Sequence, residues 1–214
     1  MSKLYLFVEG HGEVEAAGNL VTRAWQGIGG TLPWCSPMRW KNLHLQTGVA
    51  KAAEYARQQA DAAGMLILRD EDDACPAQTG PQLAAWLDTA RLPFPAAGVL
   101  MHREYEVLFL PCLPMMAGQL LGVGAAARPA IRAGTSWPHP TWESKRDIKG
   151  WISEQYVRGG YKPTIDQLAL TRLIDLPTLR TANVPCFGTL ERALVFLNAR
   201  AGQPALFAGV YPHV

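Results

Sequence analysis

Residues 3–13 read Lys3-Leu-Tyr-Leu-Phe-Val-Glu-Gly-His-Gly-Glu13, and this stretch decides the fold. Leu4 to Val8 is an apolar run of strand length, and the glycines that follow it favour a tight turn. From Glu13 to Gln26 the apolar residues recur at helical spacing. The stretch therefore predicts a buried strand that turns directly into a helix, with an acid on each side of the turn.

The same order of elements repeats through the first half of the chain. Strand patterns recur over residues 65–68 and 96–101, and helical patterns lie over residues 48–63 and 78–89. Residues 31–46 are rich in Trp and Pro and are expected to form an irregular or edge-strand region. Alternating strands and helices indicate an α/β fold with a parallel or mostly parallel sheet flanked by helices.

The pattern changes after residue 109, where helical periodicity replaces the alternation. Three helices are expected there, over residues 142–157, 164–173 and 190–199. We therefore expect an α/β core over residues 1–109 and a helical C-terminal extension, residues 110–214, packed on that core.

Length and composition narrow the class of protein. The chain has 214 residues, about half of them apolar, which suits one large domain or a domain with an appendage. It contains neither an uninterrupted apolar run of membrane-spanning length nor the residue order of a signal peptide, so we expect a cytoplasmic protein without a membrane partner. The four cysteines are scattered, which favours free thiols over a zinc site or a disulfide framework.

The net charge of +2 hides an asymmetry. Eight of the 18 carboxylates lie in three short clusters, which leaves ten acidic residues against 20 basic ones elsewhere. Residues 128–200 carry eleven basic and six acidic side chains. A basic body around an acidic focus suits a protein that holds a polyanion by its backbone. Alternatively, the Lys and Arg side chains serve solubility alone.

Each acidic cluster lies at or just after the end of an apolar run. The clusters are Glu9 with Glu13, the run Asp70-Glu-Asp-Asp73, and Glu104 with Glu106. Like charges brought together repel one another unless something neutralises them, and a hard divalent cation with oxygen ligands does so. The sequence therefore predicts a Mg²⁺ or Mn²⁺ site at the carboxyl ends of the strands.

The first two clusters supply the expected metal ligands. Glu9 is a candidate ligand or proton-transfer group, and Glu13 a candidate ligand for a second ion. Glu13 alternatively complements the dipole of the helix that it begins. Asp70 and Asp72 have the alternate spacing that points two side chains the same way in an extended segment, although a polar turn would also account for them.

Glu104 and Glu106 repeat the alternate spacing in an apolar segment, where a buried acid needs a partner. A catalytic role is one interpretation. The other is a salt bridge to one of three lysines, Lys145, Lys149 or Lys162. His11 is a candidate proton shuttle, although a lone His in a glycine turn is more often a bystander.

An apolar strand ending in Glu9-Gly10, followed by a strand ending in Asp70-x-Asp72, resembles the Toprim domain of topoisomerases, primases and nucleases. The resemblance implies that Glu9 transfers a proton or binds metal and that Asp70 and Asp72 bind magnesium. With Glu13 as a second acid, the motif is similar to the two-metal nucleases of the overcoming-lysogenization-defect class.

More of the chain resembles a narrower Toprim-like family, the DUF4276 proteins. The similarity runs from about residue 4 to residue 198 and includes Arg103 to Phe109, the lysine before Trp151, Tyr161-Lys162 and Cys186 to Leu190. The chain departs from the family pattern at Val107-Leu108, where Ala-Trp is usual, and at Cys186, where Ser is common. The resemblance implies a link to bacterial defence against phage and to ATPase partners.

These observations together predict a metal-dependent nuclease that hydrolyses the phosphodiesters of DNA or RNA. The expected metal ligands are Glu9, Glu13, Asp70 and Asp72, and the expected catalytic side chains are Glu9, Glu13, Glu104, Glu106, Lys149 and Lys162. The alternative is a non-catalytic Toprim-like module of an ATPase complex, in which the Trp- and Pro-rich stretches form an interface. Nucleotidyl transfer is a third interpretation, which the lack of a nucleotide-binding motif makes weaker.

Overall fold

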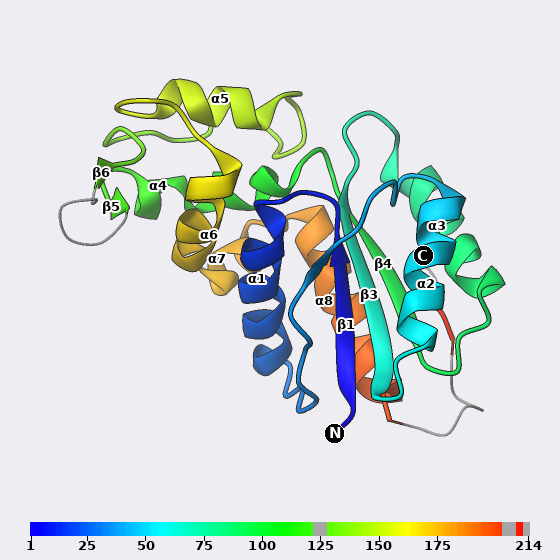
Figure 1. Cartoon of the computed structure of the whole chain (residues 1–214). Coiled ribbons are helices and arrows are strands. Elements are labelled where there is room, and N and C mark those ends of the chain that lie inside the picture. The colour runs from blue at the N-terminus through cyan, green and yellow to red at the C-terminus, as the bar shows by residue number, and fades with distance from the viewer. Residues whose placement is uncertain (122–127, 203–208, 212–214) are drawn as a thin grey trace.

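The computed structural model describes residues 1–121, 128–202 and 209–211 (Figure 1). Its centre is a four-stranded sheet in the order β2-β1-β3-β4, in which every neighbouring pair is parallel. The strands are β1 (Lys3–Val8), β2 (Met38–Arg39), β3 (Ala62–Asp70) and β4 (Ala96–Met101). The predicted α/β fold with a parallel sheet is confirmed.

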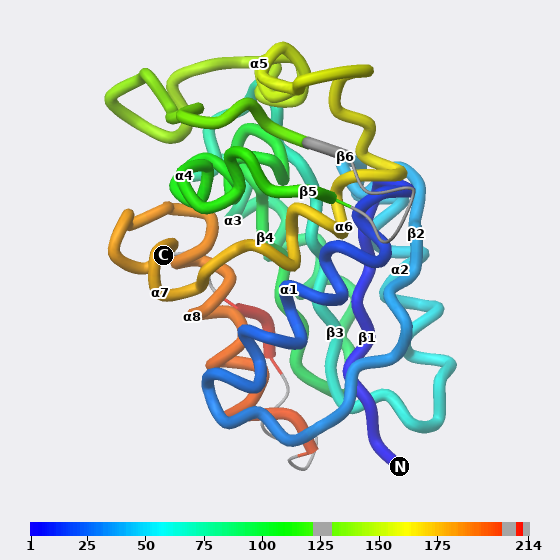
Figure 2. Tube along the Cα trace, turned by 90° about the vertical axis from the view of Figure 1, so that its left-hand side faces the viewer, coloured from blue at the N-terminus to red at the C-terminus, as the bar shows by residue number. Residues whose placement is uncertain are grey.

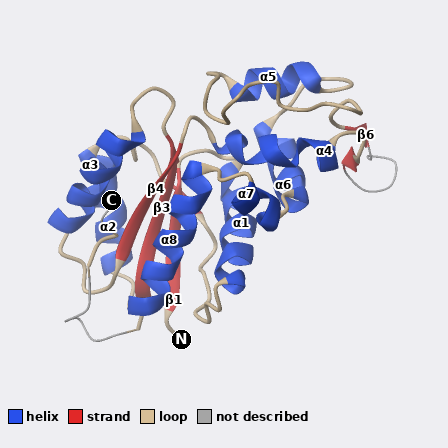
Figure 3. Cartoon of the chain, turned by 180° about the vertical axis from the view of Figure 1, so that it is seen from behind, coloured by secondary structure: helices blue, strands red, loops and turns tan. Residues whose placement is uncertain are grey.

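Helices cover both faces of the sheet. The helices α1 (Glu13–Gly27) and α8 (Pro185–Arg200) lie on one face, and α2 (Gln46–Arg57) and α3 (Pro76–Thr89) lie on the other, as Figures 1 and 3 show. Because successive strand residues point to opposite faces, alternate residues of β1 join two different hydrophobic clusters. Burial on both faces explains why β1 reads as an unbroken apolar run.

The remaining elements form a second layer beyond the ends of the strands, on the side of α1 (Figures 1 and 2). They are the 3₁₀ helix η1 (Tyr105–Cys112), α4 (Leu113–Met116), the short antiparallel pair of β5 (Leu120–Leu121) and β6 (Arg128–Pro129), α5 (Ile148–Gln155), α6 (Pro163–Leu173) and α7 (Leu176–Thr181). Among the described residues, no helix has the length and apolar character needed to cross a membrane.

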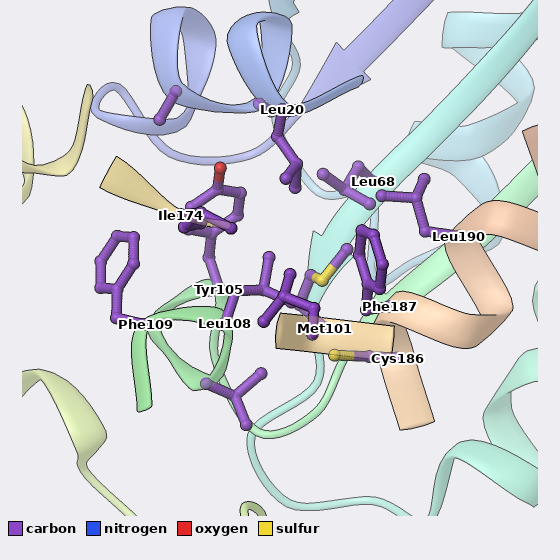
Figure 4. Packing of buried hydrophobic residues seen from close by; sticks show 14 of the residues in the cluster. Leu20, Leu68, Met101, Tyr105, Leu108, Phe109, Ile174, Cys186, Phe187 and Leu190 are labelled. Carbon is purple, nitrogen blue, oxygen red and sulfur yellow. The ribbon is translucent and has the colours of Figure 1, made fainter. Parts of the chain in front are cut away.

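One hydrophobic cluster joins the two halves of the chain. Figure 4 shows Leu20 of α1, Leu68 of β3 and Met101 of β4 packed with side chains of η1 and α8, among them Tyr105 and Phe187. All five are at most 2% exposed. This shared core fixes η1 and the helices after it relative to the strands, and so fixes the acids that they carry.

Two expected helices have different bounds in the structure. The helix expected over residues 48–63 ends at Arg57, because Ala62 already pairs with Lys3 in the sheet. Ladder hydrogen bonds therefore outweigh the helix propensity of this Ala-rich segment. The helix expected over residues 142–157 spans only Ile148–Gln155, because the Asp147 side chain caps it by accepting from the Gly150 N–H at 2.9 Å.

The last helices also differ from expectation. Helix α8 begins at Pro185, five residues before the start expected from periodicity, with proline in its first turn. Helix α7 was not expected. Its Asp175 cap accepts from the Thr178 N–H at 2.9 Å, a local signal that a six-residue helix without long periodicity can still carry.

The C-terminal residues 209–211 lie against the outer edge of β4. The Ala96 N–H donates to the Gly209 carbonyl at 2.9 Å, and the Tyr211 N–H donates to the Ala96 carbonyl at 2.9 Å. Val210 forms a parallel bridge with Ala96. This contact extends the sheet by one short segment at the amino end of β4.

Candidate active site at the carboxyl ends of the strands

The strand order creates a topological switch point between β1 and β3. From β1 the chain passes to β2 on one side, and it then crosses to β3 on the other side. Val8 pairs with Leu68 and Asp70 pairs with Met101, so the acids that follow these strands emerge at one end of the sheet. In open α/β sheets, ligands bind in the crevice outside such a switch point.

Lys149, in the first turn of α5, is the centre of the acidic cluster. Its Nζ lies 2.8 Å from Asp70 Oδ2, 3.6 Å from Glu104 Oε1 and 3.6 Å from Glu106 Oε2. Its backbone N–H also donates to Glu104 Oε2 at 3.0 Å. The structure thus brings one lysine together with acids from two of the three sequence clusters.

Asp70 is held on both carboxylate oxygens. Its Oδ2 faces Lys149, and its Oδ1 accepts from the Tyr105 N–H at 2.7 Å. Burial raises the pKa of Asp70 well above its usual value; Lys149 opposes this shift, and the charges of Glu13 and Glu106 add to it. The ionised form of Asp70 therefore depends on Lys149.

Glu106 is fully buried, and its two oxygens have different surroundings. Its Oε1 accepts from the Tyr161 hydroxyl at 2.7 Å and from Gln167 Nε2 at 3.2 Å. Its Oε2 faces Lys149 but has no hydrogen-bond partner among the described residues. Burial raises the pKa of Glu106 to about 7, although Lys149 and the Tyr161 hydroxyl both act to lower it.

At Lys149, in contrast to the acids, the neighbouring charges outweigh the effect of burial on the pKa. Burial favours the neutral amine, but the attraction of Asp70, Glu106 and Glu104 outweighs burial and raises the pKa of Lys149. Lys149 is therefore the permanent cation of the site.

Glu13 lies at the start of α1 and is also buried. The Gly10 N–H donates to Glu13 Oε2 at 3.1 Å, and a Cβ at Gly10 would lie 2.5 Å from Glu13 Oε1, so any larger residue at this position would displace the Glu13 carboxylate. Burial raises the pKa of Glu13; the Gly10 N–H and Lys149 oppose the shift, and Glu9 adds to it. The position fits the helix-dipole interpretation and also places Glu13 within the field of Lys149.

The other expected site residues lie around this cluster. Glu9 Oε1 is 3.3 Å from His44 Nδ1, in the loop before α2. Asp72, Lys162 and His11 are exposed. In the described ranges, the Asp72 side chain makes no hydrogen bond or ion pair, whereas its carbonyl accepts from Arg103 at 3.0 Å. No group of three or more His, Cys, Asp or Glu side chains within these ranges is placed to hold a metal ion, and the metal site stays a prediction.

The structure also distinguishes the three lysines weighed as partners for Glu104 and Glu106. Lys149 pairs with both acids. Lys162 instead contributes a backbone N–H, which donates to Asp166 Oδ2 at 2.8 Å. Periodicity and spacing did not single out Gln167, whose amide donates to Glu106 from α6, or His44, which contacts Glu9. Neither residue lies in a motif, so no sequence signal pointed to them.

The raised pKa of Glu106 predicts a measurable pH dependence of stability. A Glu in an unfolded chain titrates near about pH 4.3, so between that pH and about 7 the folded protein binds more protons than the unfolded chain. The protonated Glu106 therefore stabilises the fold fully below about pH 4.3, and this stabilisation is lost as the pH rises through about 7. Glu106→Gln removes this titration. Between about pH 5 and about pH 8, the free energy of unfolding of the wild type should therefore fall by on the order of 2–3 kcal/mol more than that of the variant.

Urea unfolding of both proteins across this pH range measures the difference. Glu154→Gln, which changes an exposed acid on α5, is the matched control and should keep the wild-type slope. Parallel pH profiles for Glu106→Gln and wild type would show that Glu106 titrates at an ordinary pH in the folded protein.

The fold and the site define a class: a parallel α/β protein with an acidic, lysine-centred cluster at its switch point. The chain matches a family model described as "Domain of unknown function (DUF4276)" over residues 8–195. Because this match covers well over half of the chain, the protein belongs to the DUF4276 family. The matched range includes all three acidic clusters and Lys149. No curated protein and no solved structure matches the chain.

Proposed function

We propose that this protein is a Toprim-like hydrolase that cuts nucleic-acid phosphodiester bonds with the help of Mg²⁺ or Mn²⁺. The observation that carries the proposal is the group of three carboxylates within 3.6 Å of Lys149 Nζ at the switch point. One lysine cannot neutralise three carboxylates, and the burial of Glu13 nearby adds a fourth. A divalent cation would relieve the excess negative charge.

The donor set fits a hard cation. Every candidate ligand offers carboxylate oxygen, which Mg²⁺ and Mn²⁺ prefer, and the buried Glu106 Oε2 has no hydrogen-bond partner within the described residues. Asp70 and Glu13 would hold the ion, with Glu9 and Asp72 as further ligands. A bound ion would polarise the phosphate and lower the pKa of a water molecule.

The side chains of the chain itself have separable roles in this proposal. Glu106, with a pKa of about 7, can take up or release a proton near neutral pH. Tyr161 and Gln167 orient its carboxylate by donating to Oε1. Lys149, charged at all working pH values, would stabilise negative charge on the phosphate, and Lys162 would hold the nucleic-acid backbone from the exposed surface.

The wider context of this activity is also part of the proposal. The Toprim relationship, a role in phage defence and an ATPase partner are supported by the sequence motifs and by the resemblance that they carry, and a cytoplasmic location is supported by the scattered free cysteines. The basic excess over residues 128–200, with eleven basic and six acidic side chains, supports a nucleic-acid substrate.

A cleavage assay tests the proposed activity. We expect the purified chain, alone or with an ATPase partner, to cut single- or double-stranded DNA or RNA in Mg²⁺ or Mn²⁺ and to leave the same substrates intact in EDTA. Binding to the substrate should weaken steeply with salt, because released counterions drive it. Cutting that continues undiminished in EDTA would contradict the metal dependence.

One observation favours the rival, a non-catalytic Toprim-like module of an ATPase complex. Lys149 already neutralises part of the acidic cluster without any ion. In that case the cluster holds β3, η1 and α5 together, and the surface formed by the Trp- and Pro-rich stretches binds another protein. Salt-insensitive association with a protein partner, with no affinity for DNA or RNA, would favour this function over the hydrolase.

A further inference from the structure

A cavity of about 480 Å³ lies beside the acidic cluster, between α3 and α8 at the carboxyl end of β4. Leu100, Pro76 and Pro185 supply apolar walls, and Glu143 and Arg192 supply opposite charges. The volume lies in the range of small-molecule sites, and a mainly apolar lining with a few polar groups is typical of them. None of the roles described above uses this cavity.

The charged groups of the cavity are held in place, and neither makes an ion pair within the described residues, although the charges of His102 and Arg103 act on the Glu143 carboxyl. Arg103 Nε donates to the Glu143 carbonyl at 3.1 Å, which fixes the backbone of this acid. Burial raises the pKa of the Glu143 carboxyl, and its carboxylate makes no hydrogen bond or ion pair in the described part of the chain. Arg192 donates to the hydroxyls of Tyr211 and Thr189, at 3.2 and 3.0 Å, rather than to a carboxylate.

Two long helices begin at this cavity. Helices α3 and α8 start at Pro76 and Pro185, and the residue before each makes no side-chain capping hydrogen bond. Helix starts carry partial positive charge, so together with Arg192 they favour an anionic group in the cavity. Glu143 favours a group that donates hydrogen bonds.

The cavity is also close to the acidic cluster along the chain. His102 lines the cavity, and Glu104, two residues later, contacts Lys149. Two residues span at most about 7 Å. Arg103 lies between them and donates to the Asp72 carbonyl as well as to the Glu143 carbonyl. The backbone at the cavity and the backbone at the acids are therefore close enough for one bound nucleotide chain to contact both.

We propose that the cavity binds a guanine nucleotide, with the guanine edge on Glu143 and a phosphate on Arg192. Guanine presents a ring N–H and an amino group side by side, and these two donors match the two oxygens of one carboxylate. The apolar walls suit the faces of a base. The inference deepens the proposed hydrolase, on which it rests, by assigning a preference for guanine beside the phosphate that is cut.

Nucleotide binding in EDTA tests the site separately from cleavage. Calorimetry with the full chain should show GMP binding roughly tenfold more tightly than IMP, which lacks the amino group, and more tightly than AMP or UMP. Glu143→Gln should reduce GMP affinity to the level of IMP, whereas Glu154→Gln, on an exposed acid outside the cavity, should leave it unchanged. Arg192→Gln should remove the advantage of GMP over guanosine.

Alkylation gives a second measurement that does not depend on a variant. Cys75 is exposed and lines the cavity, whereas Cys35 lies elsewhere, so GMP should slow the alkylation of Cys75 and leave that of Cys35 unchanged. Equal affinities for the four nucleotides, or GMP affinity unchanged in Glu143→Gln, would overturn the guanine site. GMP binding without any cleavage would support the site while the hydrolase fails, and cleavage without nucleotide preference would overturn the site alone.

Discussion

Asp70→Asn should lower metal-dependent cleavage by at least about 10²–10³-fold while leaving the fold intact. The amide keeps an acceptor for the Tyr105 N–H, which now donates to Asp70 Oδ1 at 2.7 Å, but it removes a charged ligand from the centre of the site. Asn loses the ion pair with Lys149, but burial disfavours the ionised Asp70 carboxyl and Lys149 keeps Glu104 and Glu106 as partners, so the free energy of unfolding should fall by only about 1–2 kcal/mol.

Cleavage in Mg²⁺ and urea unfolding measure the two effects on the same preparation. The matched control is Asp73→Asn, three residues on, whose exposed carboxylate pairs with Arg146 at the surface and which should cut like wild type. Wild-type cleavage by Asp70→Asn would place the chemistry elsewhere. Asp70→Asn is a sharper test than Asp70→Ala, because alanine would also leave the Tyr105 N–H unpaired.

Lys149→Met should produce the largest loss of stability, about 2–3 kcal/mol near pH 8. Removing one partner of a buried charge pair costs more than this, but the Lys149 side chain is 32% exposed and water screens part of the effect. Methionine retains the apolar stem and leaves Asp70, Glu104 and Glu106 without their cation. Most of the loss should disappear near pH 5, because burial raises the pKa of the Asp70 and Glu106 carboxyls, which then take up protons once the cation that opposed this shift is gone.

Urea unfolding at both pH values, with Lys162→Met as the exposed control, measures this dependence. Millimolar Mg²⁺ should stabilise Lys149→Met more than wild type if the acids can hold an ion once the lysine is gone. A loss that is equal at both pH values would show that Lys149 acts through packing rather than through its charge.

The sequence predicted best those helices and strands whose buried residues recur at a regular spacing. Strand β1 and helix α1 follow directly from the apolar run and the helical spacing of residues 4–26. The end of α2 was not predictable in this way, since the pairing of Ala62 with Lys3 is a contact between distant segments. Local propensity contains no information about such a pairing.

The site shows the same division. The three acidic clusters could be found because acids that follow apolar strands are unusual. Which lysine they meet could not be predicted, because Lys149 is 79 positions from Asp70 and spacing along the chain does not show whether Lys145, Lys149 or Lys162 reaches the acids. The surroundings of Glu106 could not be predicted either. Its carboxylate accepts hydrogen bonds from Tyr161 and Gln167, which reach it only because the chain around α6 packs against η1.

The contact of residues 209–211 with β4 has a consequence for how molecules of this protein meet one another. An open edge strand offers unpaired backbone groups on which a second chain can build, which is a common start of aggregation. Here Val210 occupies the edge at Ala96, so the apolar strand β4 is shielded at its amino end from addition by another molecule. Residues 209–211 thus compete with any second molecule for pairing with this part of β4.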